Sequence, residues 1–169
     1  MGVEIERRFL LKGHPWWKMP GAKYRTIKQG YLSILPESTV RVRLESYVED
    51  RVGVNHGYIT IKGKSNGAIR REYEYQISAA DAEEMIANLC QHVLEKRRWY
   101  LPYGDRVWHV DVFEGPNWGL AIAEIELDSE DESLELPPWI VTEITNDHRY
   151  ANSNLSVNPW NSWKPVDNQ

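Results

Sequence analysis

Long stretches of this chain alternate one for one between polar and apolar residues. In residues 3–9, a period of two places Glu4, Glu6 and Arg8 on one face and apolar side chains on the other. This alternation predicts a β-strand, and it recurs in seven further segments. These are residues 40–45, 58–64, 70–77, 94–101, 107–113, 120–127 and 139–145. A hairpin through residues 50–57 is expected to join two of them.

One segment has the spacing of an amphipathic helix instead. Ser78 is a suitable N-cap residue, and Asp81 follows three residues later, as in a variant of the capping box. Apolar residues then recur at helical intervals: Met85, Ile86, Leu89, Cys90 and Val93. The tail from about residue 152 is rich in Asn, Ser and Pro, so an irregular or only locally helical segment is expected there. About eight strands with one or two helices, without repeats or linkers, predict one α+β domain over residues 1–169.

The polar faces of the predicted strands carry charged pairs of the same sign. The pairs are Glu4 and Glu6, Arg41 and Arg43, Glu72 and Glu74, Lys96 and Arg98, and Glu124 and Glu126. One such strand is most simply explained as the solvated face of an antiparallel sheet. Five of them favour another explanation, because neighbouring like charges repel and add nothing to solubility. Acidic pairs suit a divalent metal, and basic pairs suit a polyanion. If the sheet closes into a barrel, these faces meet in one charged lumen.

Composition narrows the classes of partner. The chain of 169 residues is 41% hydrophobic, which is enough for a globular core. Its formal net charge of −5 argues against nucleic acid as the main partner. No apolar run is long enough to span a membrane, and Cys90 is the single cysteine, so a cytoplasmic protein without a disulfide is expected. The eight tryptophans are interpreted as packing between the outside of a barrel and helices, rather than as a platform for stacking bases.

Short motifs in a fixed order connect these features to a known family. The motifs are Glu4-x-Glu6-x-Arg8, Gln29-Gly30-Tyr31-Leu32, Arg41-x-Arg43, Thr60-x-Lys62, Arg70-x-Glu72-x-Glu74, Lys96-x-Arg98, Asp111-x-Phe113, Glu124-x-Glu126, and Glu143 to Tyr150. Together they resemble the CYTH domain, or triphosphate tunnel metalloenzyme, superfamily. One residue departs from the family pattern, because Arg8 stands where lysine is usual. Arginine keeps the charge but cannot lose its proton to act as a base.

The resemblance implies a fold and a set of site residues. The fold is α+β: an eight-stranded antiparallel β-barrel, the triphosphate tunnel, with a few helices outside. The implied ligands of Mg²⁺ or Mn²⁺ are Glu4, Glu6, Asp111, Glu124 and Glu126. Further tunnel acids, which would hold a second metal or orient basic residues, are Glu72, Glu74 and, as a second implied role, Asp111. The implied substrate-binding residues are Arg8, Arg41, Arg43, Lys62, Arg70, Lys96 and Arg98. The implied catalytic residues are Tyr31, Lys62, Lys96 and Arg98.

The leading functional hypothesis from this resemblance is metal-dependent hydrolysis of triphosphates, above all inorganic tripolyphosphate. Three alternatives stay open: a class IV type adenylate cyclase, a thiamine triphosphatase, and a non-catalytic binder of polyphosphate or nucleotide. Arg8 favours the binder slightly, whereas the intact acids favour an enzyme. The expected partner is a small molecule that contains a triphosphate, and neither nucleic acid nor a membrane is expected. Exposed aromatic residues and open barrel edges are compatible with a homodimer.

Overall fold

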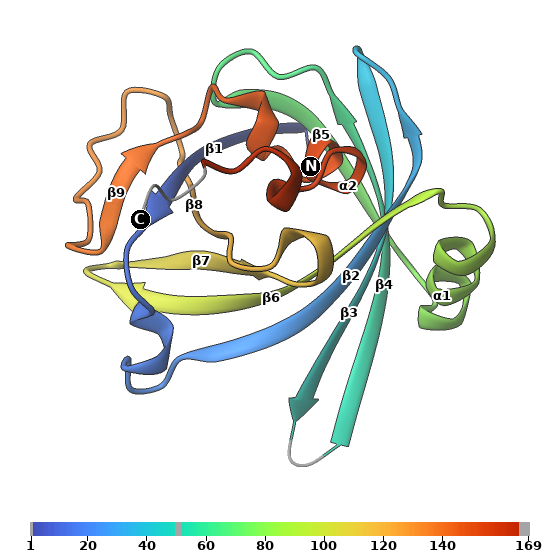
Figure 1. Ribbon diagram of the computed structural model, residues 1–169, viewed down its shortest axis with the longest axis horizontal. Helices are drawn as coiled ribbons and strands as arrows, with labels where there is room; N and C mark the ends of the chain where they lie inside the picture. Colours follow the sequence, from blue (N-terminus) through green and yellow to red (C-terminus); the bar gives the residue numbers. More distant parts are fainter. Residues whose placement is uncertain (1, 50–51, 166–169) are drawn as a thin grey trace.

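The strands form a closed barrel in the computed structural model, which describes residues 2–49 and 52–165. The strands are β1 (Gly2–Leu11), β2 (Lys23–Ile34), β3 (Ser38–Glu49), β4 (Val52–Gly63), β5 (Ile69–Ile77), β6 (His92–Tyr103), β7 (Arg106–Phe113), β8 (Ala121–Glu126) and β9 (Ile140–Glu143). Their order is β5-β4-β3-β2-β6-β7-β8-β1, and antiparallel pairing of β1 with β5 closes the ring (Figure 1). The prediction of an eight-stranded antiparallel barrel is therefore confirmed. Strand β9 pairs with the end of β1 outside this ring.

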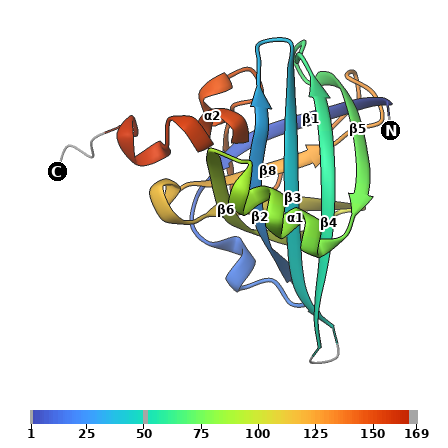
Figure 2. The ribbon, with the colours of Figure 1, turned by 90° about the vertical axis from the view of Figure 1, so that its right-hand side faces the viewer.

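The helices are short and lie outside or across the barrel. The α-helices are α1 (Ala79–Asn88) and α2 (Asn152–Val157), and the 3₁₀ turns are η1 (Pro15–Trp17), η2 (Gly115–Asn117), η3 (His148–Tyr150) and η4 (Trp160–Ser162). Helix α1 lies on the outer wall of the barrel, and α2 lies at one side of it (Figure 2). The tail is locally helical, as expected. None of the described helices is long and apolar enough to cross a membrane.

Helix α1 begins as predicted but ends earlier. The Ser78 hydroxyl accepts a hydrogen bond of 3.0 Å from the Asp81 backbone N–H, so the predicted N-cap is confirmed. The helix ends at Asn88, and the predicted apolar positions Leu89 and Val93 are 62% and 39% exposed. Val93 already belongs to β6, where its side chain is on the outer face. The predicted helix was too long because Leu89 and Val93, which lie beyond its end, happen to continue its apolar spacing.

The largest buried hydrophobic cluster lies outside the barrel wall. Phe9 and Trp108 are 1% and 0% exposed, and their rings meet edge to face at 5.6 Å. Trp139, from the segment before β9, packs on Trp108 at the same distance of 5.6 Å. The interpretation of the tryptophans as exterior packing is confirmed for this cluster, although β9, loops and η1, which contributes Trp16, cover it rather than an α-helix. Trp118 is an exception at 70% exposed.

A second buried hydrophobic cluster packs against Leu155 of α2. Its residues Leu94, Phe113 and Ile122 lie on the strand faces that carry Lys96, Asp111 and Glu124.

The strand prediction differs from the structure in three details. Strand β2 has no predicted counterpart, because its inward residues Arg25, Ile27 and Gln29 mix charged, apolar and neutral polar types and hide the period of two. Residues 139–145 were expected as a strand, and β9 confirms a strand over residues 140–143, but it pairs with β1 outside the closed ring. The predicted hairpin is tighter than 50–57, since β4 begins at Val52; residues 50–51 lie outside the described residues.

Candidate active site

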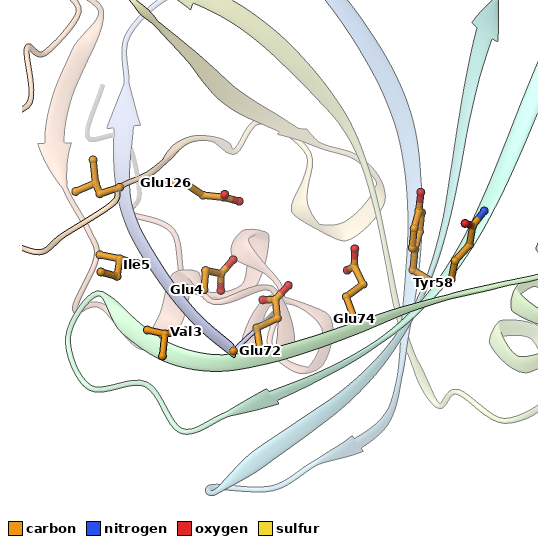
Figure 3. Close-up of a pocket in the computed structure, with 10 residues that line it drawn as sticks. Val3, Glu4, Ile5, Tyr58, Glu72, Glu74 and Glu126 are labelled. Carbon is orange, nitrogen blue, oxygen red and sulfur yellow. The ribbon is translucent and has the colours of Figure 1, made fainter.

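The charged faces of the strands converge on the inside of the barrel. They enclose a cavity of about 280 Å³, here called the charged lumen. Its lining residues are Glu4, Glu6, Arg25, Arg41, Arg43, Glu45, Tyr58, Lys62, Arg70, Glu72, Glu74, Arg98, Tyr100, His109, Glu124, Glu126 and Asn152. In Figure 3, the carboxylates of Glu4, Glu72, Glu74 and Glu126 point into one space, whereas Val3 points away from it. Around this cavity, the period of two along most strands thus separates a charged interior from an apolar exterior.

The two ends of the lumen differ. The starts of β1, β2, β4 and β7 and the ends of β3, β5, β6 and β8 lie at one end, because neighbouring strands are antiparallel. Two larger cavities, of about 430 and 1170 Å³, adjoin the lumen here, so this is called the open end. At the opposite, covered end, residues 151–153 lie beside Arg8 and Tyr31, and only about 40 Å³ of space remains. A ligand can therefore enter from the open end.

Glu4 and Glu6 are two residues apart but have opposite electrostatic environments. Burial alone would raise the pKa of Glu4, but Lys62 at 3.5 Å and Arg70 at 2.5 Å outweigh it and hold that pKa well below its usual range. Burial, together with the nearby carboxylates of Glu124 and Glu4, raises the pKa of Glu6 to about 7. Glu4 is thus held ionised by neighbouring cations, whereas Glu6 lies close to other acidic side chains. A divalent cation bound beside Glu6 would offset the repulsion between these carboxylates.

The crowded carboxylates have the chemistry of a site for a hard cation. Strand pairing places Glu6 opposite Glu126, and Glu124 opposite Arg8. Burial and Glu4 raise the pKa of Glu126 as well. Among the described residues, no group of three or more acidic, histidine or cysteine side chains is already arranged as a metal cluster. Mg²⁺ and Mn²⁺ prefer carboxylate oxygens as ligands, so these side chains fit such an ion. The carboxylates become available when the lysine and arginine side chains that now pair with them bind a substrate instead.

The basic residues on β4 and β5 are held by neighbouring carboxylates. Lys62 lies 2.5 Å from Glu72, and Arg70 lies 3.8 Å from Glu6. Burial, with Arg41 and Arg70 nearby, lowers the pKa of Lys62. These ion pairs are partly buried. An anion that enters the lumen would offer Lys62 and Arg70 an alternative to their carboxylate partners. The cations are thus positioned to exchange a carboxylate for a phosphate.

Lys96 and Asp111 are buried behind the lining and form an ion cluster with Arg98, which reaches the lumen. Asp111 is 0% exposed, and both of its oxygens accept hydrogen bonds from Arg98, at 2.7 Å from Nε and 2.8 Å from Nη2. Lys96 Nζ also binds Asp111, and it donates to Asn152 Oδ1 at 3.3 Å. Burial would lower the pKa of Arg98, but Asp111 and Glu124 raise it. With its oxygens occupied, Asp111 orients the two bases, which is one of the two roles implied for it by the sequence.

Arg41 is a buried cation with a long ion pair. It is 6% exposed, its Nε has no hydrogen-bond partner, and its nearest carboxylate is Glu74 at 3.5 Å. Burial and the neighbouring Arg43 lower its pKa. A buried guanidinium whose only ion pair is this long, and whose Nε has no partner, is incompletely compensated. An entering phosphate would supply the missing partner, with the bidentate geometry that guanidinium groups favour.

At the covered end, Arg8 and Tyr31 both line the small remaining space. Arg8 lies 4.0 Å from Glu6 and donates to the Thr145 carbonyl oxygen at 3.1 Å. Burial raises the pKa of Tyr31 to about 12, so its hydroxyl stays protonated near neutral pH. Tyr31 also accepts a hydrogen bond of 3.0 Å from Gln29. Both residues are therefore suited to hold an anion rather than to remove a proton.

The structure brings all the sequence-predicted site residues together. Most line the charged lumen, Arg8 and Tyr31 flank its covered end, and Lys96 and Asp111 lie just behind Arg98. Sequence reasoning missed six lining residues. They are Arg25, Glu45, Tyr58, Tyr100, His109 and Asn152. Glu45 and His109 could have been found, since the alternation places them on the same faces as Arg43 and Asp111. Asn152 carries no such signal, because it enters from the tail.

The comparison with known families now decides the classification. The family model described as "CYTH domain" matches residues 2–156. The chain belongs to the CYTH domain family. The matched region contains every strand of the barrel and the residues that line its lumen. This CYTH domain therefore has the fold and the family that its ordered motifs predicted.

Two curated relatives share most of their length with this CYTH domain. The inorganic triphosphatase of Acetivibrio thermocellus is 41% identical over 165 residues, covering 97% of this chain and 99% of the relative. The inorganic triphosphatase of Nitrosomonas europaea is 33% identical over 159 residues, covering 92% and 97%. A crystal structure of an inorganic triphosphatase superimposes with a TM-score of 0.64 and 28% identity, covering 93% of this chain and 96% of the other.

Proposed function

We propose that this CYTH domain hydrolyses inorganic triphosphate with Mg²⁺ or Mn²⁺ as its metal. The observation that carries the proposal is the charged lumen, where seven glutamates and six arginines or lysines line one cavity. These charges nearly cancel, so a polyanion entering alone would leave an excess of negative charge. A polyanion entering with a divalent cation would not, because the bases take phosphate oxygens and the released acids take the metal. The named activities of the two relatives support the same reaction.

The residues divide into a metal side and a phosphate side. Glu4, Glu6, Glu124 and Glu126 would hold the metal. When bound, a divalent cation supplies Lewis-acid polarisation of phosphoryl oxygens and lowers the pKa of a bound water. Glu72 and Glu74 keep Lys62 and Arg43 in place until an anion arrives, at 2.5 and 3.0 Å.

The phosphate side neutralises charge as the bridging bond breaks. Arg41, Lys62 and Arg70 would bind phosphate oxygens from the β3–β5 wall, and Arg98 would bind them from β6. Asp111 and Asn152 fix the bases of β6, so little reorganisation is needed during the reaction. At the covered end, Arg8 and Tyr31 would donate to the phosphate that lies deepest.

The test is to incubate the protein with tripolyphosphate or ATP, each with Mg²⁺ or Mn²⁺, and to measure orthophosphate and cyclic AMP. We expect orthophosphate from tripolyphosphate and no cyclic AMP. Cyclic AMP with pyrophosphate from ATP would replace the proposal with the cyclase reaction. Tight binding of tripolyphosphate without turnover would replace it with the non-catalytic binder.

A further inference from the structure

Thr60 is the uncharged member of the Thr60-x-Lys62 motif, and it lies behind the wall of the charged lumen. It belongs to β4, is 0% exposed, and is not among the residues that line the lumen. The strand register places Arg41 of β3 directly opposite it on one side and Glu74 of β5 directly opposite it on the other. Directly opposed residues share one face of a sheet, so the three side chains are neighbours on the inner face. Thr60 therefore lies between a cation and an acid that both line the lumen.

The chemistry of its partners fixes the direction of the two hydrogen bonds that Thr60 makes. Its Oγ1 lies 3.1 Å from Arg41 Nη2 and 2.9 Å from Glu74 Oε2. A guanidinium can only donate and an ionised carboxylate can only accept, so the hydroxyl accepts from Arg41 and donates to Glu74. Each of these bonds involves a charged group, which makes it stronger than a hydrogen bond between neutral groups. Thr60 thus links Arg41 to Glu74 without carrying a charge itself.

Glu74 is already bound by another arginine. Its two carboxylate oxygens accept hydrogen bonds of 3.1 and 3.0 Å from Arg43 Nη2. The direct distance between Arg41 Nη2 and Glu74 Oε2 is 3.5 Å, which is longer than either hydrogen bond of Thr60. Arg41 is therefore held in place by a neutral hydroxyl, and that hydroxyl is held by a carboxylate that a different cation neutralises.

Lys62 and Arg70 are held by carboxylates at closer range than Arg41 is. Each of them has a carboxylate oxygen 2.5 Å away. A phosphate that binds either one must displace that carboxylate, which then needs another positive partner. A phosphate that binds Arg41 displaces a neutral hydroxyl instead, and the hydrogen bond from Thr60 to Glu74 can stay in place. Arg41 can thus change partners without leaving a buried acid unpaired.

We propose that Thr60 is a positioning residue for Arg41: its hydroxyl holds the guanidinium ready for an entering phosphate, without the competition that a second carboxylate would bring. The inference rests on the proposed function, because Arg41 must bind a phosphate of the substrate. A donor that is already oriented needs little reorganisation when charge develops on the phosphate. Thr60 acts only through Arg41, so its removal should weaken only what Arg41 does.

Orthophosphate release from tripolyphosphate, measured for Thr60 variants in two backgrounds, tests this proposal. Thr60→Val keeps the shape of the side chain and removes the hydroxyl, so kcat/KM should fall about ten- to a hundredfold, as loss of a hydrogen bond to a charged group does. Thr60→Ser keeps the hydroxyl and should retain most of the wild-type rate. In an Arg41→Met protein, Thr60→Val should cause no further loss, because the group through which Thr60 acts is gone. The matched control is Thr142→Val, which changes an exposed threonine of β9 outside the ring and should have no effect.

The outcomes separate the role of Thr60 from the reaction itself. The same loss from Thr60→Val in both backgrounds, full activity of Thr60→Val, or an equal loss in Thr60→Ser would overturn the proposal for Thr60. Wild-type protein that binds tripolyphosphate without releasing orthophosphate would overturn the proposed function alone. Calorimetric dissociation constants for tripolyphosphate with Mg²⁺ would then complete the same comparison of variants. If Thr60→Val does not fold, Thr60→Ala replaces it, since it differs from Thr60→Ser only in the hydroxyl.

Discussion

Replacing Asp111 with asparagine should strongly destabilise this protein. Asp111 is 0% exposed, and it is the carboxylate that Lys96 and Arg98 share. Lys96 is itself 2% exposed, so it cannot turn to solvent when its partner is lost. Asparagine has almost the same shape as aspartate, so the change removes the negative charge without leaving a cavity. Arg98 would then keep Glu124 as its carboxylate partner, and Lys96 would keep only the neutral side chain of Asn152.

The expected magnitude follows from the cost of an unpaired buried charge. Removing one partner of a buried pair typically costs about 3–5 kcal/mol. For a domain of this length, each kcal/mol shifts the melting temperature by about 2–4 °C, so a fall of about 6–20 °C is expected. The pKa of Asp111 is held below its ordinary value, because Arg98 and Lys96 outweigh the effect of burial. Its stabilisation is therefore present above the unfolded-state pKa and is lost as the pH falls through the folded-state value.

Urea denaturation at several pH values measures both effects. The difference in unfolding free energy between wild type and Asp111→Asn should be largest near neutral pH, and it should shrink below about pH 4, where the carboxyl begins to bind protons in the unfolded state. The matched control is Asp105→Asn, an exposed turn residue between β6 and β7, which should stay within about 0.5 kcal/mol of wild type. A loss below about 1 kcal/mol at neutral pH would refute the view that Asp111 holds two buried cations.

Three further predictions concern the lumen. Arg41→Met should lower kcat/KM for tripolyphosphate by about 10²–10³-fold, as loss of a preorganised charge partner does. It should leave the unfolding free energy unchanged or raised, because it removes a poorly compensated buried charge; a large loss of stability would contradict this reading. Tyr31→Phe should reduce activity without moving the alkaline limb of the pH–rate profile below pH 9, because the pKa of Tyr31 is about 12; a displaced limb would make Tyr31 a base. Mg²⁺ and tripolyphosphate should each tighten binding of the other by the same factor in calorimetry, and Glu6→Gln should bring that factor toward one; independent binding in wild type would contradict the exchange of partners in the lumen.

The sequence predicted the inward face of most strands because β geometry is local. A period of two is sufficient to place Glu4, Glu6 and Arg8 together, whichever strands become neighbours. Charge made the signal stronger, since same-sign pairs such as Arg41 and Arg43 have no purpose on a solvated face. The same rule failed for β2, whose inward residues are chemically mixed.

What the sequence could not predict depends on neighbours that are distant in the chain. The role of Asp111 follows from the register of β6 against β7, which places Arg98 opposite it. Asn152 reaches Lys96 from the tail, across 56 positions. The stack of Tyr47 on His56 requires the antiparallel pairing of β3 with β4. Tertiary contacts of this kind set the electrostatics of the site, and no short motif records them.

The decisive measurement is the rate of orthophosphate release from tripolyphosphate by metal-stripped protein before and after addition of Mg²⁺ or Mn²⁺. Wild type and Glu83→Gln, a change on the exposed face of α1, should be inactive when stripped and fully active with metal. Glu6→Gln should stay folded, because the buried carboxyl it replaces is already costly to ionise, and it should lose at least about 10²-fold in rate with either metal. Metal-independent turnover, or full activity of Glu6→Gln, would contradict catalysis by a metal held in the charged lumen.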